Sequence, residues 1–518
     1  MIDYKPRPSE DQSDTFSFHS GMDSINDPTF LGKGKVTDLV NMDFNDYGPV
    51  ARVGYTLHGN AGNSIVNAHG AILRESGDIH VRAFGTNFQK LVGATWTNVA
   101  TITNKQATIV SYICSDLTTA ASLSGTATSG SSSKILQVSG GSMTINTHSG
   151  KIVRVTSGTG AGQENMIVGN DLTDIFVQDS FETVPDATSV FEVRSVISHV
   201  IFTNGTDTPF KYDGTTKTDL TAWVKFHSID VNHDRLLGTR EDIDMVYISN
   251  IGSDFFPKDN FIPVNQNADS IIAIQKNHEE TVIYKENSRY RLIGYDLDSF
   301  QLVTADEHIG CIARKSVTHG NNYNFFLGHG GVYSINSLDN SSTDEGIPIS
   351  RDITNKILAH TAQELSQAVG WINENRYYLS VGNEVFVYHI AQSQQAKSHV
   401  WSRHTYADPI KSAFYLSGEV YLGGIQSYIV GGSSDNNTVI TCTVETGDRS
   451  QKDKNRFKVY HRDYINFSRT ATTVQVYVGI DGATPTLQAT LSTTTTTGQM
   501  KLMINKRGKT IRYKYVFP

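Results

Sequence analysis

Cysteine is scarce in this sequence, and the three that occur, Cys114, Cys311 and Cys442, lie far apart among 518 residues. This spacing excludes a dense disulfide framework and a CxxC metal-binding knuckle, because both need cysteines close together in the sequence. We therefore expect the protein to be made in a reducing compartment.

Long apolar segments are missing as well. The first ten residues are polar and charged, and no run of about 18 apolar residues occurs, so the sequence predicts neither secretion nor a membrane-spanning helix.

Neither sign of charge dominates, since 44 basic and 52 acidic residues give a net charge of −8. A surface dedicated to nucleic acid is normally clearly basic, so this balance favours a soluble particle or a lumen that repels DNA.

Common signatures of catalysis are also absent. The motifs GxSxG and HExxH do not occur. The glycine-rich segment 158–163 (GTGAGQ) lacks the Lys and the Ser or Thr of a phosphate-binding loop, so we interpret it as a β-turn. Asp230, Asn232 and Asp234 are spaced as in a calcium-binding loop, but Arg235 stands where that loop requires glycine.

The remaining candidates for chemistry have simpler interpretations. The segment His278-Glu279-Glu280 is predicted to lie in a turn between two strands. His319 and His329 are two loop histidines without a third metal ligand, and Cys311, in an apolar strand, is expected to be a buried small hydrophobic residue. The sequence thus assigns no catalytic, cofactor-binding or metal-binding residue, and we expect no cofactor and no enzyme activity.

What the sequence does contain is typical of strands and turns. It has 43 Gly, 23 Tyr and 23 Phe together with many Thr and Ser, and its length calls for several cores. We predict an all-β protein consisting of a β-propeller, an inserted small β-sandwich or barrel module, and a C-terminal β-sandwich platform.

The predicted domain boundaries follow changes in amino-acid composition and residue pattern along the chain. The expected parts are an extended N-terminal arm over residues 1–40, platform strands and first propeller strands over 41–117, an inserted β module rich in Ser, Thr and Gly over 118–196, propeller blades over 197–434, and a β-sandwich over 435–518. One helix is predicted over residues 350–364, capped by Ser350 or Asp352.

The propeller prediction is based on a degenerate repeat. Between residues 198 and 433 a strand, a polar turn, an aromatic-rich strand and a Gly or Asp-Gly turn recur about every 40 to 50 residues. Residues 70–96 supply a further candidate blade, with a turn at Ser76-Gly77-Asp78. Five to seven blades are plausible.

Several of these segments resemble the tail nozzle and tail hub proteins of short-tailed bacteriophages. The resemblance lies in NMDFNDYGPVARVGY (residues 41–55, ending in Arg-x-Gly-Tyr), in DRLLGT and VYISNIGSDFFP (residues 234–257), and in the pattern Phe-Leu-Gly-x-x-Gly-Val-Tyr (residues 326–333). It covers about residues 41 to 432.

This resemblance implies a structural virion protein of a bacteriophage tail, made in the host cytoplasm. It implies a homo-oligomer, usually a hexameric ring below the portal or adaptor proteins, with tail fibres or tail-tip proteins as further partners. Genomic DNA would pass through its channel during ejection without sequence-specific binding, and no membrane would be involved.

Two other functions remain open. The first is a host-receptor or carbohydrate-binding propeller at the tail tip, with aromatic residues such as Tyr377-Tyr378 and Phe255-Phe256 as contacts. The second is a propeller glycoside hydrolase with dispersed acidic residues, such as Asp230, Asp234 and Asp254. The repeated Ser-x-Asp-x-Gly-x-x-Trp turns of sialidases do not occur in the sequence.

Overall fold

The computed structural model describes most of the chain. The described residues are 18–45, 48–264, 269–295, 299–320, 322–336, 346–450, 455–467, 473–492 and 498–517. Strands make up 51% of the structure and helices 5%, which confirms the all-β prediction. No helix in the described ranges is long and apolar enough to cross a membrane.

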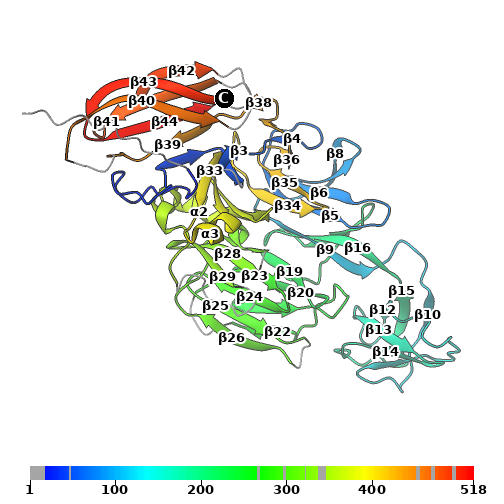
Figure 1. Cartoon of the computed structure of the whole chain (residues 1–518). Coiled ribbons are helices and arrows are strands. Elements are labelled where there is room, and N and C mark those ends of the chain that lie inside the picture. The colour runs from blue at the N-terminus through cyan, green and yellow to red at the C-terminus, as the bar shows by residue number, and fades with distance from the viewer. Residues whose placement is uncertain are drawn as a thin grey trace, which may run out of the picture.

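A propeller forms the middle of the molecule (Figure 1). Its first four blades are antiparallel sheets of four strands each. Blade 1 contains β5 (Val66–Ile72), β6 (Ile79–Phe84), β7 (Asn87–Val92) and β8 (Thr95–Thr101); blade 2 contains β9 (Thr108–Ser115), β16 (Val196–Thr203), β17 (Phe210–Tyr212) and β18 (Lys217–Asp219). Blade 3 contains β19 (Ser228–Asn232), β20 (Arg235–Thr239), β21 (Met245–Ile248) and β22 (Phe261–Pro263); blade 4 contains β23 (Ile271–Asn277), β24 (Glu280–Lys285), β25 (Arg289–Ile293) and β26 (Gln301–Asp306).

Three more blades complete the ring within the described ranges. Blade 5 contains β27 (Thr318–Gly320), β28 (Tyr323–Gly328) and β29 (Gly331–Asn336); blade 6 contains β30 (Val369–Asn373), β31 (Arg376–Val381), β32 (Glu384–His389) and β33 (Trp401–Thr405). Blade 7 contains β34 (Ser412–Leu416), β35 (Glu419–Gly423) and β36 (Ser427–Val430), and its fourth strand is β4 (Tyr55–Leu57) from near the N-terminus. The first strands of successive blades contact one another in a closed cycle, so the described chain forms a seven-bladed propeller.

Apolar clusters join most neighbouring blades. Phe88 of blade 1, for example, packs against Phe202 and Phe210 of blade 2. The junction of blades 7 and 1 is polar instead, because the two ring nitrogens of His69 lie 2.9 Å from the hydroxyls of Ser412 and Ser427. The junction of the last blade with the first is thus held by directional hydrogen bonds.

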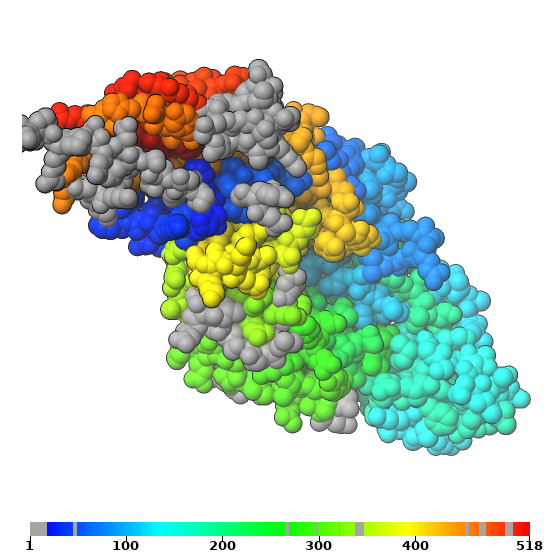
Figure 2. Space-filling model, in the orientation of Figure 1, coloured from blue at the N-terminus to red at the C-terminus, as the bar shows by residue number. Residues whose placement is uncertain are grey.

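The insert is a separate lobe between the first two strands of blade 2 (Figures 1 and 2). Its antiparallel sheet has the order β10 (Leu123–Thr126), β15 (Val190–Arg194), β12 (Ile152–Ser157), β13 (Glu164–Asn170), β14 (Asp174–Val177), β11 (Ile135–Gln137). A bridge between Ala127 and Val138 joins the two edges, so the sheet closes into a small barrel around its own apolar cluster.

The C-terminal platform continues the sheet of blade 6. After β33 the order runs β1 (Asp38–Val40), β39 (Cys442–Glu445), β44 (Ile511–Phe517), β41 (Thr473–Ile480), β42 (Thr486–Ser492), and a two-stranded ribbon of β40 (Lys458–Phe467) and β43 (Gly498–Gly508) lies beside it. Two short hairpins flank the platform, β2 (Met42–Asn45) with β3 (Gly48–Ala51) and β37 (Ser434–Asp435) with β38 (Thr438–Val439). One hydrophobic cluster spans blades 5 and 6 and the platform, so propeller and platform share a core.

The N-terminal region and the predicted helix differ from expectation. Residues 1–17 lie outside the described residues, whereas both ends of residues 18–40 reach the shared core, in which Met22 and Leu39 are fully buried. The single helix predicted over residues 350–364 is wrong: η2 (Arg351–Ile353), α1 (Thr354–Ile357) and α2 (Ala362–Ser366) replace it. These helical segments do not form one helix, because Thr361 forms a capping box with Glu364 and begins a new helix. The other helices are η1 (Arg314–Ser316) and α3 (Ile390–Ala396).

Candidate functional site

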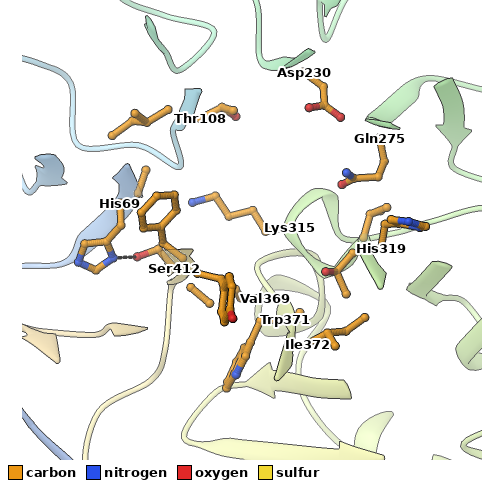
Figure 3. Close-up of a pocket in the computed structure, with 18 of the residues that line it drawn as sticks. His69, Thr108, Asp230, Gln275, Lys315, His319, Val369, Trp371, Ile372 and Ser412 are labelled. Carbon is orange, nitrogen blue, oxygen red and sulfur yellow. Dashed lines mark hydrogen bonds between the residues drawn. The ribbon is translucent and has the colours of Figure 1, made fainter. Parts of the chain in front are cut away.

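A cavity of about 890 Å³ lies on the propeller axis. Its walls are the first strands of the blades, among them β5, β9, β19, β23 and β30, which bring together residues from 68 to 420 (Figure 3). Its labelled lining residues include Thr108, Gln275 and Trp371. A volume of this size is in the range of small-molecule sites.

Two adjacent basic residues of η1 form one end of this cavity. Arg314 donates to the carbonyl oxygens of His227, before β19, and Gln106, before β9, the latter at 3.1 Å. Lys315 extends across the axis and donates to the carbonyl oxygens of Asn67 in β5 and Lys411 before β34, the latter at 3.5 Å (Figure 3). One short turn of blade 5 therefore ties together blades 1, 2, 3 and 7.

The electrostatics of this end are unusual. Burial, followed by repulsion from Arg314, lowers the pKa of Lys315 well below its ordinary value, and burial lowers the pKa of Arg314 to about 10. Among the described residues neither cation is paired with a carboxylate in an ion pair, and Glu241 is the one group that raises the pKa of Arg314. Two basic groups are thus placed in a cavity with carbonyl partners alone.

The cavity walls also contain titratable side chains that already have hydrogen-bond partners. Burial lowers the pKa of His69 well below its usual value, with Arg82 and Lys315 among the further causes, so His69 is neutral between its two serine partners. Asp230 accepts hydrogen bonds from the backbone amides of Val231 and Lys276, while its burial raises its pKa.

A second charged site closes the ring. Arg52 is 3% exposed, donates through both terminal nitrogens to the carboxylate of Asp435, and lies over the Tyr406 ring. A Cβ on Gly54 would lie 2.1 Å from the carbonyl oxygen of Ser434, so only glycine fits there. Tyr55 begins β4 in blade 7, and the Arg-x-Gly-Tyr segment of the sequence is therefore the latch of the propeller.

A third charged site docks the insert onto blades 2 and 3. Arg235 of β20 is 1% exposed and bonds both oxygens of Asp179 in the insert at 2.6 and 2.8 Å. The carboxylate of Glu164 in β13 is buried next to the Lys211–Asp254 ion pair, whose atoms lie 2.7 Å apart. Burial, followed by repulsion from Asp254, raises the pKa of Glu164 to about 7.

Most motifs with simple interpretations lie where those interpretations place them, but His319, predicted in a loop, lies in β27. Residues 158–163 connect β12 to β13 as a hairpin turn, and residues 278–279 connect β23 to β24. His319 bonds Asn324, whereas His329 is paired with Glu286, so the structure gives the two histidines different partners. Among the described residues no group of three or more His, Cys, Asp or Glu could hold a metal ion.

The other sequence candidates are buried in packing or bonded elsewhere. Cys311 is fully buried as expected but lies in a loop, not in the predicted strand, and its thiol donates to the carbonyl of Ala313. Tyr377 and Tyr378 are buried between blades, where they stack on Phe325 and Trp371.

The three acidic residues considered for hydrolysis have separate surroundings. Asp230 faces the axial cavity, Asp254 is paired with Lys211 beside the insert, and Asp234 lies in the turn between β19 and β20. The basic pair at residues 314 and 315 was not predicted, because two adjacent basic residues normally indicate a solvated surface.

The comparison with protein families decides the general identity. A family model described as "Bacteriophage P22 Gp10, beta-propeller" matches residues 108–438, which is more than half of the chain and includes blades 2 to 7 and the insert. The chain belongs to this family. The Gp10 propeller family supports a bacteriophage structural protein and thus a place in the virion. No curated protein matches the sequence.

Solved structures show only distant similarity to this Gp10-family chain. The extracellular domain of a hybrid two-component system protein from B. thetaiotaomicron is 9% identical, with a TM-score of 0.40, over 83% of this chain and 43% of that one. BamB from Moraxella catarrhalis is 8% identical, with a TM-score of 0.34, over 75% and 93%. The Neurospora crassa Pan2 WD40 domain is 8% identical, with a TM-score of 0.31, over 61% and 90%.

Proposed function

We propose that this protein is a subunit of a bacteriophage tail nozzle or hub ring that forms a channel for DNA ejection. The observation that carries the proposal is the match of residues 108–438 to the Gp10 propeller family. In this proposal six copies form the ring below the portal or adaptor proteins, and fibres or tail-tip proteins attach to it. The protein catalyses nothing.

The surface of the platform ribbon supports this proposal. Strand alternation turns Leu502 and Ile504 inward and leaves Val459, Tyr464 and Met503 exposed by 52%, 44% and 51%. We call the outward side the β40–β43 face; its exposed basic residues are Arg462, Lys501, Arg507 and Lys509. Aromatic rings support these cations, with Arg507 and Lys509 5.4 and 5.3 Å from the centre of the Phe457 ring.

The β40–β43 face is the surface that we assign to DNA. Its one acidic neighbour in β40, Asp463, is partly buried and accepts a hydrogen bond from Tyr515, so the outward side is locally basic on a chain of net charge −8. Basic side chains contact phosphates without reading bases, and such contacts weaken with salt. A few of them would guide DNA along the channel without holding it at one sequence.

Mass measurement on the purified full chain tests the ring. We expect a species close to six times the chain mass of 57.0 kDa, either alone or after addition of portal or adaptor protein. A chain that stays monomeric with these partners, and that is absent from purified phage particles, would refute the proposal.

A further inference from the structure

The two cations at one end of the axial cavity, Arg314 and Lys315, have unusual hydrogen-bond partners. Several buried cations of this chain face carboxylates, as Arg52 faces Asp435, Arg235 faces Asp179 and Lys211 faces Asp254. Arg314 and Lys315 face carbonyl oxygens only, within the described residues. A carbonyl dipole satisfies a donor but does not neutralise its charge, so the cavity end keeps an excess of positive charge.

Two further observations concern this excess. Arg82 is 2% exposed, bonds the neutral groups of Gln89 and Ser427, and lowers the pKa of His69 in the cavity wall. The Nε of Arg314 is buried and has no hydrogen-bond partner among the described atoms. The region therefore contains a third cation bonded to neutral groups, whereas the enclosed Nε of Arg314 is not open to the cavity.

We propose that the axial cavity binds a small oxyanion, a sulfate, phosphate or carboxylate group carried by a small polar molecule, with Lys315 and Arg314 as its contacts. A planar guanidinium beside an ammonium group offers several N–H donors, which can bind the several oxygens of such a group. The hydroxyl of Thr108, the amide of Gln275 and the ring of Trp371 line the remaining space and suit an uncharged polar body.

Binding at this site is coupled to a proton. The other charged or titratable groups around Lys315 are Arg314 on its own turn, with Glu241 acting on it, His69 and Arg82 from blade 1, and Asp230, His319 and Glu374 on the cavity walls. An anion stabilises the ammonium form of Lys315, so anion binding and protonation of this lysine favour each other. The affinity therefore increases as the pH falls.

Calorimetric titration of the full chain with sodium sulfate tests this site. Sulfate keeps its charge from pH 6 to pH 9, and sodium chloride at equal ionic strength is the control salt. We expect saturable binding of one sulfate per chain, with a heat that depends on the buffer because a proton is taken up. Lys315→Met should weaken binding at least tenfold, whereas Lys134→Met, an exposed lysine of the insert, should leave it unchanged.

A second measurement needs no variant. Sulfate should slow the acylation of Lys315 in the unaltered protein, as followed by mass spectrometry, without slowing that of Lys134. Absence of saturable binding, or equal binding by Lys315→Met, or acylation of Lys315 at the same rate with and without sulfate, would each overturn the proposal. The test is made per chain and is independent of whether the chain forms a ring.

Discussion

The latch of the propeller and the docking site of the insert are both buried and charged, but they differ in how many groups they bring together. At the latch one arginine, Arg52, meets one carboxylate, Asp435. At the docking site Arg235 pairs with Asp179 and Lys211 pairs with Asp254, while Glu164 lies 3.4 Å from the partly exposed Arg154. Burial and repulsion from Asp254 raise the pKa of Glu164 to about 7, so the docking site contains a group that changes its protonation near neutral pH.

Breaking the latch is expected to have the largest effect. Arg52→Ala leaves Asp435 without its partner and should lower the free energy of unfolding by about 3 kcal/mol, since removing one partner of a buried pair is strongly destabilising. Urea denaturation measures this loss. Arg240→Ala, which breaks the more exposed Arg240–Asp242 pair, should cost less than about 1 kcal/mol, and equal losses in the two variants would contradict the latch.

Breaking the insert's ion pair should be nearly as costly but local. Asp179→Ala leaves Arg235 buried and uncompensated at the docking site, at a cost of about 3 kcal/mol. Because the insert has its own apolar cluster, it should come loose while the blades stay folded. Proteolysis should then cleave at the ends of the insert, near residues 116 and 195, and uniform degradation of the whole chain would count against this view.

Removing the titrating carboxylate of Glu164 should stabilise the docking site. The pKa of Glu164 is about 7 in the folded chain against an ordinary 4.5, so the folded state binds more protons between these values and its stability falls as the pH rises from about 4.5 to about 7. Glu164→Gln should gain up to about 2 kcal/mol at pH 8 and nothing at pH 4.5. Hydrogen exchange of the insert at both pH values measures this; a gain that does not depend on pH would argue against titration of Glu164.

Reversing charges on the β40–β43 face should hardly change stability. Arg462→Glu with Arg507→Glu alters exposed side chains, so the free energy of unfolding should change by less than about 0.5 kcal/mol each. DNA binding by the assembled ring should weaken, and its salt dependence should become less steep by about two phosphate contacts per subunit. The matched variant Lys134→Glu should leave DNA binding as it is.

Local patterns in the sequence predicted much of the fold. Segments of alternating polarity separated by Gly or Asp turns form hairpins in the structure, as at residues 76–78. The change in amino-acid composition after residue 118 marks the insert. Pairings between distant segments were not predictable in this way. The seventh blade takes its fourth strand from Tyr55–Leu57, some 370 residues before its partner Tyr428, and a three-residue strand contains no information about its partner.

The charged sites, too, depend on pairings between distant segments that the sequence alone does not predict. Arg52 and Gly54 belong to a segment that was noted for its family resemblance, but the partner Asp435 lies in an ordinary-looking Ser-Asp pair. The excess of positive charge at Arg314 and Lys315 remains because their partners from four blades are carbonyl oxygens and not carboxylates. Only the folded ring brings these groups together.

An image of the assembled protein tests the central proposal most directly. Electron cryomicroscopy of the full chain, purified with its portal or adaptor proteins, should show a closed ring with the β40–β43 face toward the lumen and the insert away from it. A ring with this face on its outer rim, or particles of single chains only, would contradict the account.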